Sequence, residues 1–190
     1  MKEKETQVLT DEQLIAQTLS GNDNAFKMLV QRHESRIAAT VIGMLGNRPE
    51  AEDVGQEVFI RFYKNLKNFR GDSAVSTYLT RIAINLSLNE IRRRKLRSLF
   101  SSIDDDEKTL ELPDESAKKP DDNSSALVHR AIRKLDTKYR TVIVLRLLEG
   151  YSTEETAEIL EIPQGTVMTR LLRAQQKLKT ILSPYFAEAK

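Results

Sequence analysis

Apolar residues recur along most of the chain with the spacing of a helix rather than that of a strand. One example lies in residues 50–66, where apolar side chains return every three or four positions. They are Ala51, Val54, Val58 and Phe62. This spacing puts them on one side of a helix, where they can face a core. No stretch has the sustained two-residue alternation of a strand, so the pattern predicts an all-α protein.

Cap residues divide the N-terminal half of the pattern into separate helices. Thr10 and Gln13 can form a capping box for a first helix, and Asp23 can cap the second. A third helix covers the stripe described above. Ser73 can cap a fourth helix that runs to about Arg97.

A second helical block begins near Ser125. Its second helix can be capped by Asp136 and stops at Gly150. Two shorter helices then follow across a tight joint, one over residues 152–160 and one from 164 to about 182.

Residues 101–125 interrupt this regularity. The segment reads SSIDDDEKTLELPDESAKKPDDNSS, with two prolines and no helical periodicity. Charge repulsion and the shortage of apolar residues favour an extended chain there. We therefore expect two small helical domains, residues 10–98 and 125–185, joined by an acidic flexible linker over residues 99–124.

Charge is distributed unevenly, although the whole chain has a formal net charge of only +2. Residues 1–100 carry 16 Lys and Arg against 12 Asp and Glu, and residues 125–190 carry 11 against 7. Residues 101–124 carry 3 against 9. Two basic blocks around an acidic one are compatible with nucleic-acid binding by the helical parts.

Several kinds of chemistry lack the residues that they need. The chain has no cysteine, which excludes disulfides, thiolate zinc sites and cysteine nucleophiles. His33 and His129 have no partners at metal-ligand spacing and are expected at the surface, and residues 104–106 lie in the linker without a rigid frame. We expect no catalytic residues, no metal, no cofactor and no enzyme activity. No apolar run is long enough to span a membrane, so we expect a cytoplasmic protein without membrane insertion.

The last two helices have the features of a helix-turn-helix. Ala157 is a small residue where the helices approach each other. The apolar residues that can hold them together are Ile159, Leu160, Ile162, Val167 and Leu171. The outward residues of the second helix, suited to phosphates and base edges in a major groove, are Thr166, Thr169, Arg170, Arg173 and Lys177. The alternative is an ordinary helical hairpin with a solvated basic side, but pattern, turn and charge together favour DNA binding.

The helix over residues 50–66 has a second side that is mostly polar. Its members recur at i, i+3, i+4 and i+7 and are Asp53, Gln56, Glu57 and Ile60. A polar surface that ends in an isoleucine suits a partner protein offering Arg or Gln side chains. A solvated acidic surface is the alternative, and periodicity alone favours it.

A third pattern occurs in residues 69–97. The residues that share roughly one side of the predicted helix are Tyr78, Ile82, Asn85, Asn89 and Arg93. Asparagine amides can read base edges, and tyrosine can stack on a base. The basic residues that can neutralise phosphates are Arg92, Arg93, Arg94, Lys95 and Arg97. The alternative is a basic tract that only complements the helix dipole.

Three of these segments, in this order, resemble conserved regions of sigma-70-type factors. AEDVGQEVFIRFYKNL resembles region 2.2, FRGDSAVSTYLTRIAINLSLNEIRRRK resembles regions 2.3 and 2.4, and LDTKYRTVIVLRLLEGYSTEETAEILEIPQGTVMTRLLRAQQKL resembles region 4. Neither region 1.1 nor a folded region 3 is present, which is the layout of the extracytoplasmic-function group. The resemblance covers nearly all of the chain except the first dozen residues and the linker. It implies a bacterial transcription initiation factor.

The resemblance also implies roles for particular residues. The core-polymerase contact, on the clamp coiled coil of the β′ subunit, would use Asp53, Gln56, Glu57 and Ile60. The opened −10 element would be captured by Arg70, Tyr78, Asn85, Asn89, Arg92 and Arg93. The helix over residues 164–179 would read the −35 element, and the β flap would be a further polymerase contact. The acidic linker would thread towards the active-site cleft, and an anti-sigma factor is a candidate partner.

Two other functions remain open at this point. One is an autonomous helix-turn-helix regulator that binds duplex DNA without polymerase, and the other is an interaction protein that sequesters an anti-sigma partner. The pair Gln56 and Glu57 beside a basic helix that reads the −10 element favours the initiation factor, because a simple repressor does not need it.

Overall fold

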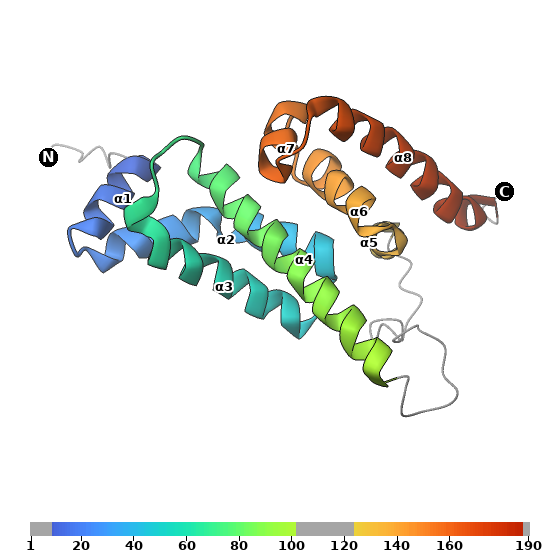
Figure 1. Ribbon diagram of the computed structural model, residues 1–190, viewed down its shortest axis with the longest axis horizontal. Helices are drawn as coiled ribbons and strands as arrows, with labels where there is room; N and C mark the ends of the chain where they lie inside the picture. Colours follow the sequence, from blue (N-terminus) through green and yellow to red (C-terminus); the bar gives the residue numbers. More distant parts are fainter. Residues whose placement is uncertain (1–8, 102–123, 188–190) are drawn as a thin grey trace, which may run out of the picture.

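The computed structural model describes residues 9–101 and 124–187, and every regular element within them is helical (Figure 1). The N-terminal domain contains α1 (Asp11–Leu19), α2 (Asp23–Leu45), α3 (Pro49–Asn65), the short 3-10 turn η1 (Leu66–Asn68) and α4 (Val75–Ser101). The C-terminal domain contains α5 (Ser124–Lys134), α6 (Thr137–Ile143), the π-helical turn η3 (Val144–Leu148), α7 (Thr153–Leu160) and α8 (Gln164–Ala187). The all-α prediction is confirmed.

Helix α2 forms the centre of the N-terminal domain, with α1, α3 and α4 packed around it. The core residues that α2 contributes are Ala25, Leu29, Ile37, Val41, Met44 and Leu45. From α3, Ala51, Val58 and Phe62 are buried and Val54 packs against the core. The predicted apolar stripe therefore does face the core, and the opposite side of α3 is left outside.

Two of the predicted caps differ from the structure. Thr10 and Gln13 do form a capping box. However, Asn22 rather than Asp23 caps α2, because its side chain accepts the backbone N–H of Asn24 at 3.1 Å. Helix α4 begins at Val75, and the preceding carbonyl, that of Ala74, accepts the first helical bond, so Ser73 lies outside it.

Helix α4 is also longer than predicted. It continues to Ser101 rather than ending near Arg97, because no glycine or proline follows to stop it. The first three residues of the predicted linker are therefore helical, and its last residue is the first of α5. The acidic residues between them, 102–123, lie outside the described residues.

The prediction that His33 lies at the surface is wrong. His33 is only 8% exposed, and its Nε2 lies 2.9 Å from Oδ2 of Asp11. It stands four residues after Leu29 and four before Ile37, so it falls on the buried side of α2. Asp11, at the start of α1, supplies the partner that a buried imidazole needs. Arg32 bonds the other carboxylate oxygen at 2.6 Å.

The C-terminal domain turns sharply between α6 and α7. Asp136 stands at the N-cap of α6, as predicted, but its side chain makes no capping bond. The π-helical turn η3 is closed by Glu149, whose N–H donates to the carbonyl of Val144 at 2.9 Å. Gly150, with φ of +73°, then reverses the chain before α7. This reversal carries Tyr151 out of η3 and towards the N-terminal domain.

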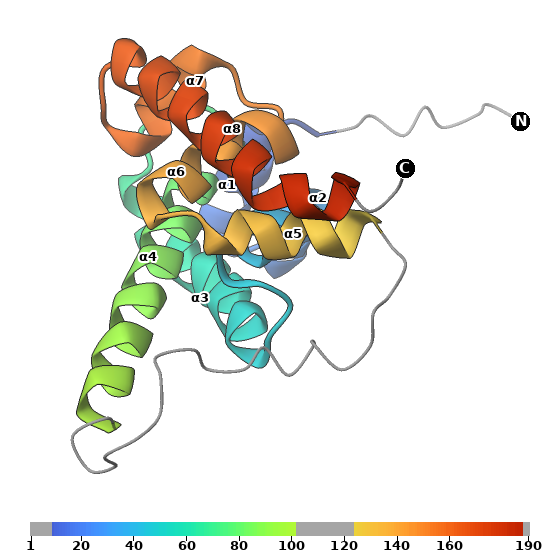
Figure 2. The same ribbon diagram turned by 90° about the vertical axis from the view of Figure 1, so that its right-hand side faces the viewer.

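The two domains lie against each other, with α7 beside α4 and with η3 and α5 beside α2 (Figures 1 and 2). None of the helices in the described ranges combines the length and the apolar character needed to cross a membrane.

Candidate protein and nucleic-acid interfaces

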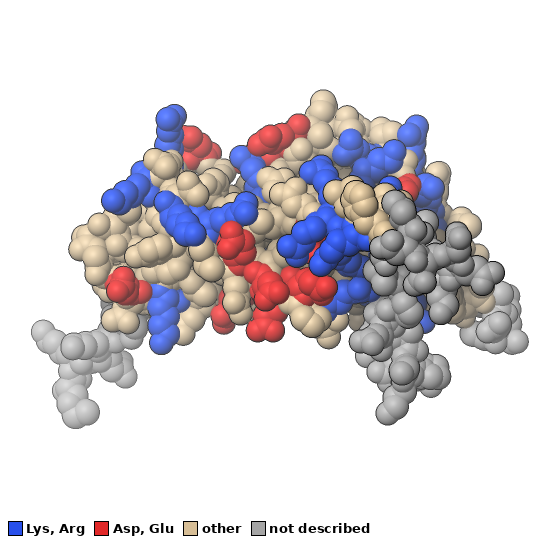
Figure 3. Space-filling view, turned by 60° about the horizontal axis from the view of Figure 1, so that its bottom comes forward, with Lys and Arg blue, Asp and Glu red and all other residues tan. Residues whose placement is uncertain are grey.

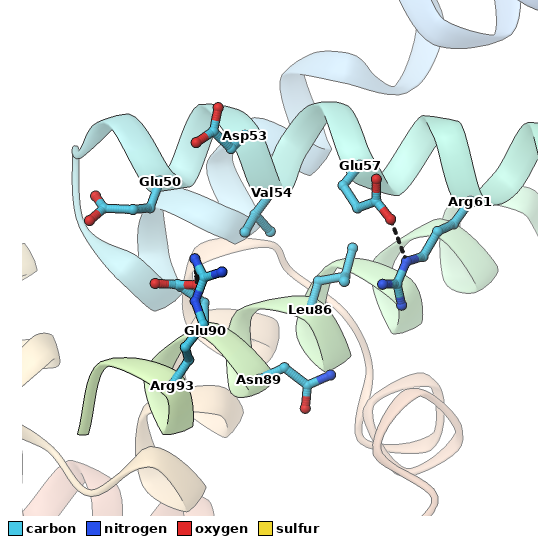
Figure 4. Close-up of a pocket in the computed structure, with 9 residues that line it drawn as sticks. All are labelled: Glu50, Asp53, Val54, Glu57, Arg61, Leu86, Asn89, Glu90 and Arg93. Atoms are coloured by element: carbon cyan, nitrogen blue, oxygen red, sulfur yellow. Dashed lines mark hydrogen bonds and ion pairs between the residues drawn. The ribbon is translucent and has the colours of Figure 1, made fainter. Parts of the chain in front are cut away.

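Helices α3 and α4 border an open groove of about 270 Å³ (Figure 4). Its lining residues are Glu50, Asp53, Val54, Glu57, Arg61, Leu86, Asn89, Glu90 and Arg93. The α3 side has three carboxylates and one arginine, whereas α4 contributes an amide, a carboxylate and an arginine. Figure 3 shows acidic side chains gathered near the middle of the molecule, with basic ones on either side. The groove therefore brings the polar side of α3 next to the polar side of α4, although the two patterns lie in separate segments of the sequence.

The outer side of α3, termed the acidic face, consists of Asp53, Gln56, Glu57 and Ile60. Asp53 and Gln56 are exposed, and Ile60 is 45% exposed in spite of its apolar side chain. Glu57 accepts a hydrogen bond from Nε of Arg61 at 2.8 Å, one turn along the helix. An exposed isoleucine beside carboxylates is suited to a protein partner that offers both apolar and basic groups.

Tyr63 extends the acidic face and was not found from the sequence. It lies three residues after Ile60 and is 50% exposed. Its ring packs edge-on against Phe26 of α2, with centroids 4.8 Å apart. The ring is thereby held in place at the surface, as expected for an aromatic contact residue in an interface.

The outer side of α4, termed the α4 strip, consists of Asn85, Asn89, Arg92 and Arg93. All four are exposed. Arg92 donates to Oδ1 of Asn89 at 3.2 Å, and Arg93 pairs with Glu90 at 2.6 Å. The strip thus offers amide donors and acceptors beside two cations, a combination that can bind bases and phosphates.

Glu90 positions the basic end of α4, a role that the sequence analysis missed. It is 6% exposed, and its two carboxylate oxygens bind Arg93 at 2.6 Å and Arg97 at 3.1 Å. The signal was a single acidic residue within a basic tract. Because both arginines also reach solvent, the pairs orient them without removing them from the surface.

Tyr78 lies apart from the α4 strip, in an aromatic cluster. Its ring is half-buried, 5.2 Å from Phe69 in an edge-on contact and 5.9 Å from Phe62. These neighbours leave only part of the ring open for a base. Arg70 is exposed in the loop that leads to α4.

Helices α7 and α8 form the predicted helix-turn-helix. Ser152 and Glu155 make a reciprocal capping box, which lowers the pKa of Glu155 through the hydrogen bonds from Ser152. Glu161, at φ of +53°, ends α7, and the backbone N–H groups of Thr166 and Val167 bond to the carbonyl of Pro163. Figure 1 shows the two helices joined by this short turn.

Burial in the helix pair follows the predicted pattern. Ile159 is 3% exposed and Val167 is fully buried, whereas Leu160, Ile162 and Leu171 are half-buried. Ala174 of α8 is also fully buried and was missed. These residues fix α8 against the rest of the domain and leave its other side outside.

The outer side of α8, termed the recognition face, consists of Thr166, Thr169, Arg170, Arg173 and Lys177. A shallow groove of about 320 Å³ joins most of it to α6, through Lys138 and Tyr139. The Nζ atoms of Lys138 and Lys177 lie 5.0 Å and 5.6 Å, respectively, from the centroid of the Tyr139 ring. Lys138 could not be predicted from the sequence, because only the tertiary fold brings α6 to α8.

Apolar side chains interrupt the recognition face. Met168 is 63% exposed and Leu172 is 58% exposed. Such groups can contact thymine methyls in a major groove, while forked arginines bind guanine edges.

Within residues 9–101 and 124–187, no group of three or more His, Asp or Glu side chains is arranged to hold a metal ion.

Both domains match known families. The sigma-70 region 2 model matches residues 29–97, and the sigma-70 region 4 model matches residues 125–178. The chain is 35% identical to the RNA polymerase sigma-H factor of Pseudomonas aeruginosa over 94% of its own length and 97% of the relative's. It is 36% identical to the ECF RNA polymerase sigma factor SigW of Bacillus subtilis, over 87% and 92%. It is 33% identical to the ECF RNA polymerase sigma-E factor of Escherichia coli, over 93% and 96%.

Solved structures agree with these relationships. CnrH, in complex with the cytosolic domain of CnrY, has a TM-score of 0.69 and 29% identity, with 92% of this chain and 97% of CnrH covered. The sigma factor RpoE of Bartonella quintana, bound to the anti-sigma factor NepR, has the same fold, with a TM-score of 0.65 and 22% identity over 83% and 96%.

The fold and the helix-turn-helix thus define a two-domain transcription initiation factor rather than an autonomous regulator. The chain belongs to the sigma-70 family, in its extracytoplasmic-function group. It directs RNA polymerase to promoters, and sigma factors are initiation factors, not enzymes. The family resemblance predicted from the sequence is confirmed.

Proposed function

We propose that three separate faces divide the work of initiation. The N-terminal domain, residues 10–98, binds core polymerase through the acidic face and the −10 element through the α4 strip. The C-terminal domain, residues 125–185, binds the −35 element through the recognition face. The observation that carries this division is that most residues of the three polar faces are exposed, and that the faces lie on three different helices.

The acidic face is proposed to bind the clamp coiled coil of the polymerase β′ subunit. Support comes from its composition, with exposed Asp53 and Gln56 around the partly exposed Ile60. Carboxylates and an amide can pair with arginine and glutamine side chains of a partner helix, and the isoleucine can anchor in a small apolar pocket. The β flap is proposed as a second polymerase contact, on the C-terminal domain.

The α4 strip is proposed to bind the opened strand of the −10 element. Unstacked bases expose their hydrogen-bonding edges, which asparagine amides can read, and Arg92 and Arg93 can neutralise the backbone. Arg70, in the loop before α4, and the open part of Tyr78, in the first turn of α4, complete the proposed set.

The recognition face is proposed to enter the major groove of the −35 duplex. Arg170 and Arg173 lie one turn apart on α8 with Thr169 beside them. Oγ1 of Thr169 donates to the carbonyl of Gly165 at 2.8 Å, so its lone pairs stay available to DNA donors. Lys138 is proposed to contact a phosphate at the edge of the same site.

Two further proposals concern the binding partners of the chain and its location in the cell. CnrH is solved with the cytosolic domain of CnrY and RpoE with the anti-sigma factor NepR, which supports an anti-sigma partner for this chain as well. The chain is proposed to act in the cytoplasm, with core polymerase and promoter DNA. The role of the acidic linker in the polymerase cleft stays a prediction, since residues 102–123 lie outside the described residues.

A charge reversal on α3 tests the polymerase contact. Gln56→Ala combined with Glu57→Arg should weaken binding to core polymerase at least tenfold, because both side chains lie off the buried stripe of α3. The matched control is Gln31→Ala with Glu34→Arg, two exposed residues with similar chemistry on α2. Affinity is measured by fluorescence anisotropy with labelled chain, and helicity by circular dichroism.

Two outcomes of this experiment distinguish a contact on α3 from a contact elsewhere. Weak binding by the α3 variant alone, with helicity retained in both, supports the proposed contact. Equal affinity of the wild type and both variants would mean that polymerase binds elsewhere on the chain.

A further inference from the structure

The last turns of α4 project beyond the neighbouring helices α2 and α3 (Figures 1 and 2). They carry three large apolar side chains at the surface, termed the apolar end. Leu96 is 55% exposed, Leu99 is 45% exposed and Phe100 is 68% exposed, the highest value among the exposed large apolar side chains of the described residues. Side chains this exposed contribute little to the core of the domain, and together they form an apolar surface patch.

The apolar end continues the α4 strip along the same side of the helix. From Asn85 the strip passes to Asn89 and Arg92, and Leu96 and Phe100 follow at the next helical positions. Each step is three or four residues, the spacing that keeps side chains on one side of a helix. One continuous surface therefore changes along its length from amides to an arginine and then to apolar groups.

Cations border the apolar end on both sides. Lys95 and Arg97 immediately precede and follow Leu96, and successive residues of an α-helix point about 100° apart. The two cations therefore project on opposite sides of the apolar side chains, and both are exposed. Arg97 is oriented by Glu90, whose Oε1 accepts a hydrogen bond from the guanidinium at 3.1 Å.

This arrangement fits the major groove of duplex DNA. The groove admits an α-helix and is bordered by two phosphate backbones, so cations on opposite sides of the helix can each neutralise one backbone. Apolar side chains between the cations then face the base edges, where the thymine methyl is the apolar group. An opened single strand has only one backbone and would leave one of the two cations without a phosphate.

The charge of the last turns of α4 favours DNA over a protein as the occupant. Residues 91–101 contain five Lys and Arg and no Asp or Glu. The core of a protein interface is depleted of charged residues, lysine among them. A dense surface of one sign is suited to a polyanion.

The position of the apolar end along the chain indicates which part of the promoter it meets. Helix α4 leads, through residues 102–123, to the domain that carries the recognition face, proposed to bind the −35 element. The C-terminal end of α4 is therefore the end of the strip nearest in sequence to the upstream domain. Leu96 lies about 10 Å along the helix from Asn89, or about three steps of 3.4 Å along DNA. The apolar end thus reaches the duplex directly upstream of the bases that Asn89 is proposed to contact.

We propose that Leu96, Leu99 and Phe100 form a further promoter contact, which reads thymine methyl groups in the major groove of the duplex directly upstream of the −10 element. Lys95 and Arg97 hold the end of α4 in the groove by binding its two backbones. This inference rests on the proposed binding of the −10 element by the α4 strip.

Uracil in place of thymine tests the contact, because this change removes only the methyl group. Three promoter fragments differ in the few base pairs directly upstream of the −10 element, which are A·T pairs, the same pairs with uracil, or G·C pairs. Fluorescence anisotropy measures the affinity of polymerase holoenzyme for each fragment. With the wild-type chain, uracil should weaken binding about fourfold for each methyl group in contact. G·C pairs, which lack the methyl group, should weaken it at least as much.

A double substitution tests whether the apolar end detects the methyl groups. Leu96→Ala with Phe100→Ala removes most of the apolar surface and keeps a good helix former at both positions. Holoenzyme with this variant should bind the thymine and uracil fragments equally, with unchanged affinity for core polymerase and for single-stranded −10 DNA. The matched control is Leu19→Ala with Met28→Ala, two exposed apolar residues on α1 and α2, which should keep the wild-type preference for thymine.

The other outcomes overturn the contact. Equal affinity of the wild-type holoenzyme for the thymine and uracil fragments would do so, and so would a preference for thymine that the variant at Leu96 and Phe100 retains. Weaker binding of this variant to core polymerase would make the apolar end a polymerase contact, and weaker binding to the single strand would place it on opened DNA.

The proposed function is tested separately from the apolar end. Asn85→Ala should weaken binding to single-stranded −10 DNA and keep the preference for thymine in the upstream duplex. Unchanged affinity of this variant for the single strand would refute the binding of the −10 element by the α4 strip, whatever the result with uracil.

Discussion

Helices α4 and α8 carry the two proposed DNA-binding surfaces, but they are built in different ways. Helix α4 is enclosed by α2, α3 and α7, and it buries polar as well as apolar residues. Its buried polar residues are Thr77, Thr80, Ser87 and Glu90. In α8, the buried side chains among the described residues are only Val167 and Ala174.

This difference explains why residue type alone predicts the proposed DNA-binding surface on α8 but not on α4. On α8 a polar residue is an outward residue, so the apolar pattern alone identifies the recognition face. On α4 polar residues are shared between DNA-facing positions such as Asn85, structural positions such as Glu90 and the domain seam at Thr80. Polar residues of the same helix therefore have three different roles, and only the fold shows which residue has which role.

The largest effect is expected from loss of the aromatic core under α4. Phe62 is 1% exposed and packs against Phe26, Phe69 and Tyr78. Phe62→Ala should lower the free energy of unfolding of the N-terminal domain by about 3–5 kcal/mol, through lost burial and a cavity. Urea denaturation followed by circular dichroism measures it.

The neighbouring Tyr63 provides the control for this change. Because Tyr63 is half exposed and makes one edge-on contact, Tyr63→Ala should cost only about 1 kcal/mol. Equal losses for the two variants would show that α4 does not depend on its enclosure by α3.

A smaller loss is expected at the start of α7. Ser152 accepts the N–H of Glu155 at 3.1 Å and completes the capping box. Ser152→Ala should cost about 1 kcal/mol and reduce −35 binding only through the stability of the helix pair. Thermal unfolding measures the cost, with Ser183→Ala on α8 as the matched control. A larger loss at position 183 would contradict the capping role.

The smallest effect concerns a phosphate contact next to α8. Lys138→Ala should weaken binding to every −35 duplex by a similar factor and reduce the slope of log affinity against log salt by about 1. Affinities are compared for a promoter duplex and a scrambled duplex. A loss confined to the promoter duplex would mean that Lys138 reads bases.

Local sequence patterns were sufficient to predict one part of the structure. The capping box at Thr10 and the stripe through Val58 depend only on residues within one or two turns. The helix-turn-helix was predicted for the same reason. The roles of individual residues in the polymerase and −10 surfaces came from the family resemblance and remain predictions.

Features that depend on residues far apart in the sequence could not be predicted. His33 finds its partner Asp11 on another helix, and Lys138 reaches α8 only through the fold of its domain. Tyr151 and Thr80 are 71 positions apart. Nothing in the spacing of apolar residues distinguishes a tyrosine that fills a domain seam from one in a core.

The division of DNA reading between α4 and α8 is tested most directly by paired binding measurements on two substitutions. Arg173→Ala and Asn85→Ala are each tested on a −35 duplex and on a −10 single strand, by fluorescence with the polymerase holoenzyme. We expect Arg173→Ala to weaken the free energy of binding by about 1–3 kcal/mol on the duplex alone, because a forked guanidinium reads a major groove. We expect Asn85→Ala to lose affinity for the single strand alone. The reverse pattern, with Asn85→Ala impaired on the duplex and Arg173→Ala on the single strand, would contradict the account.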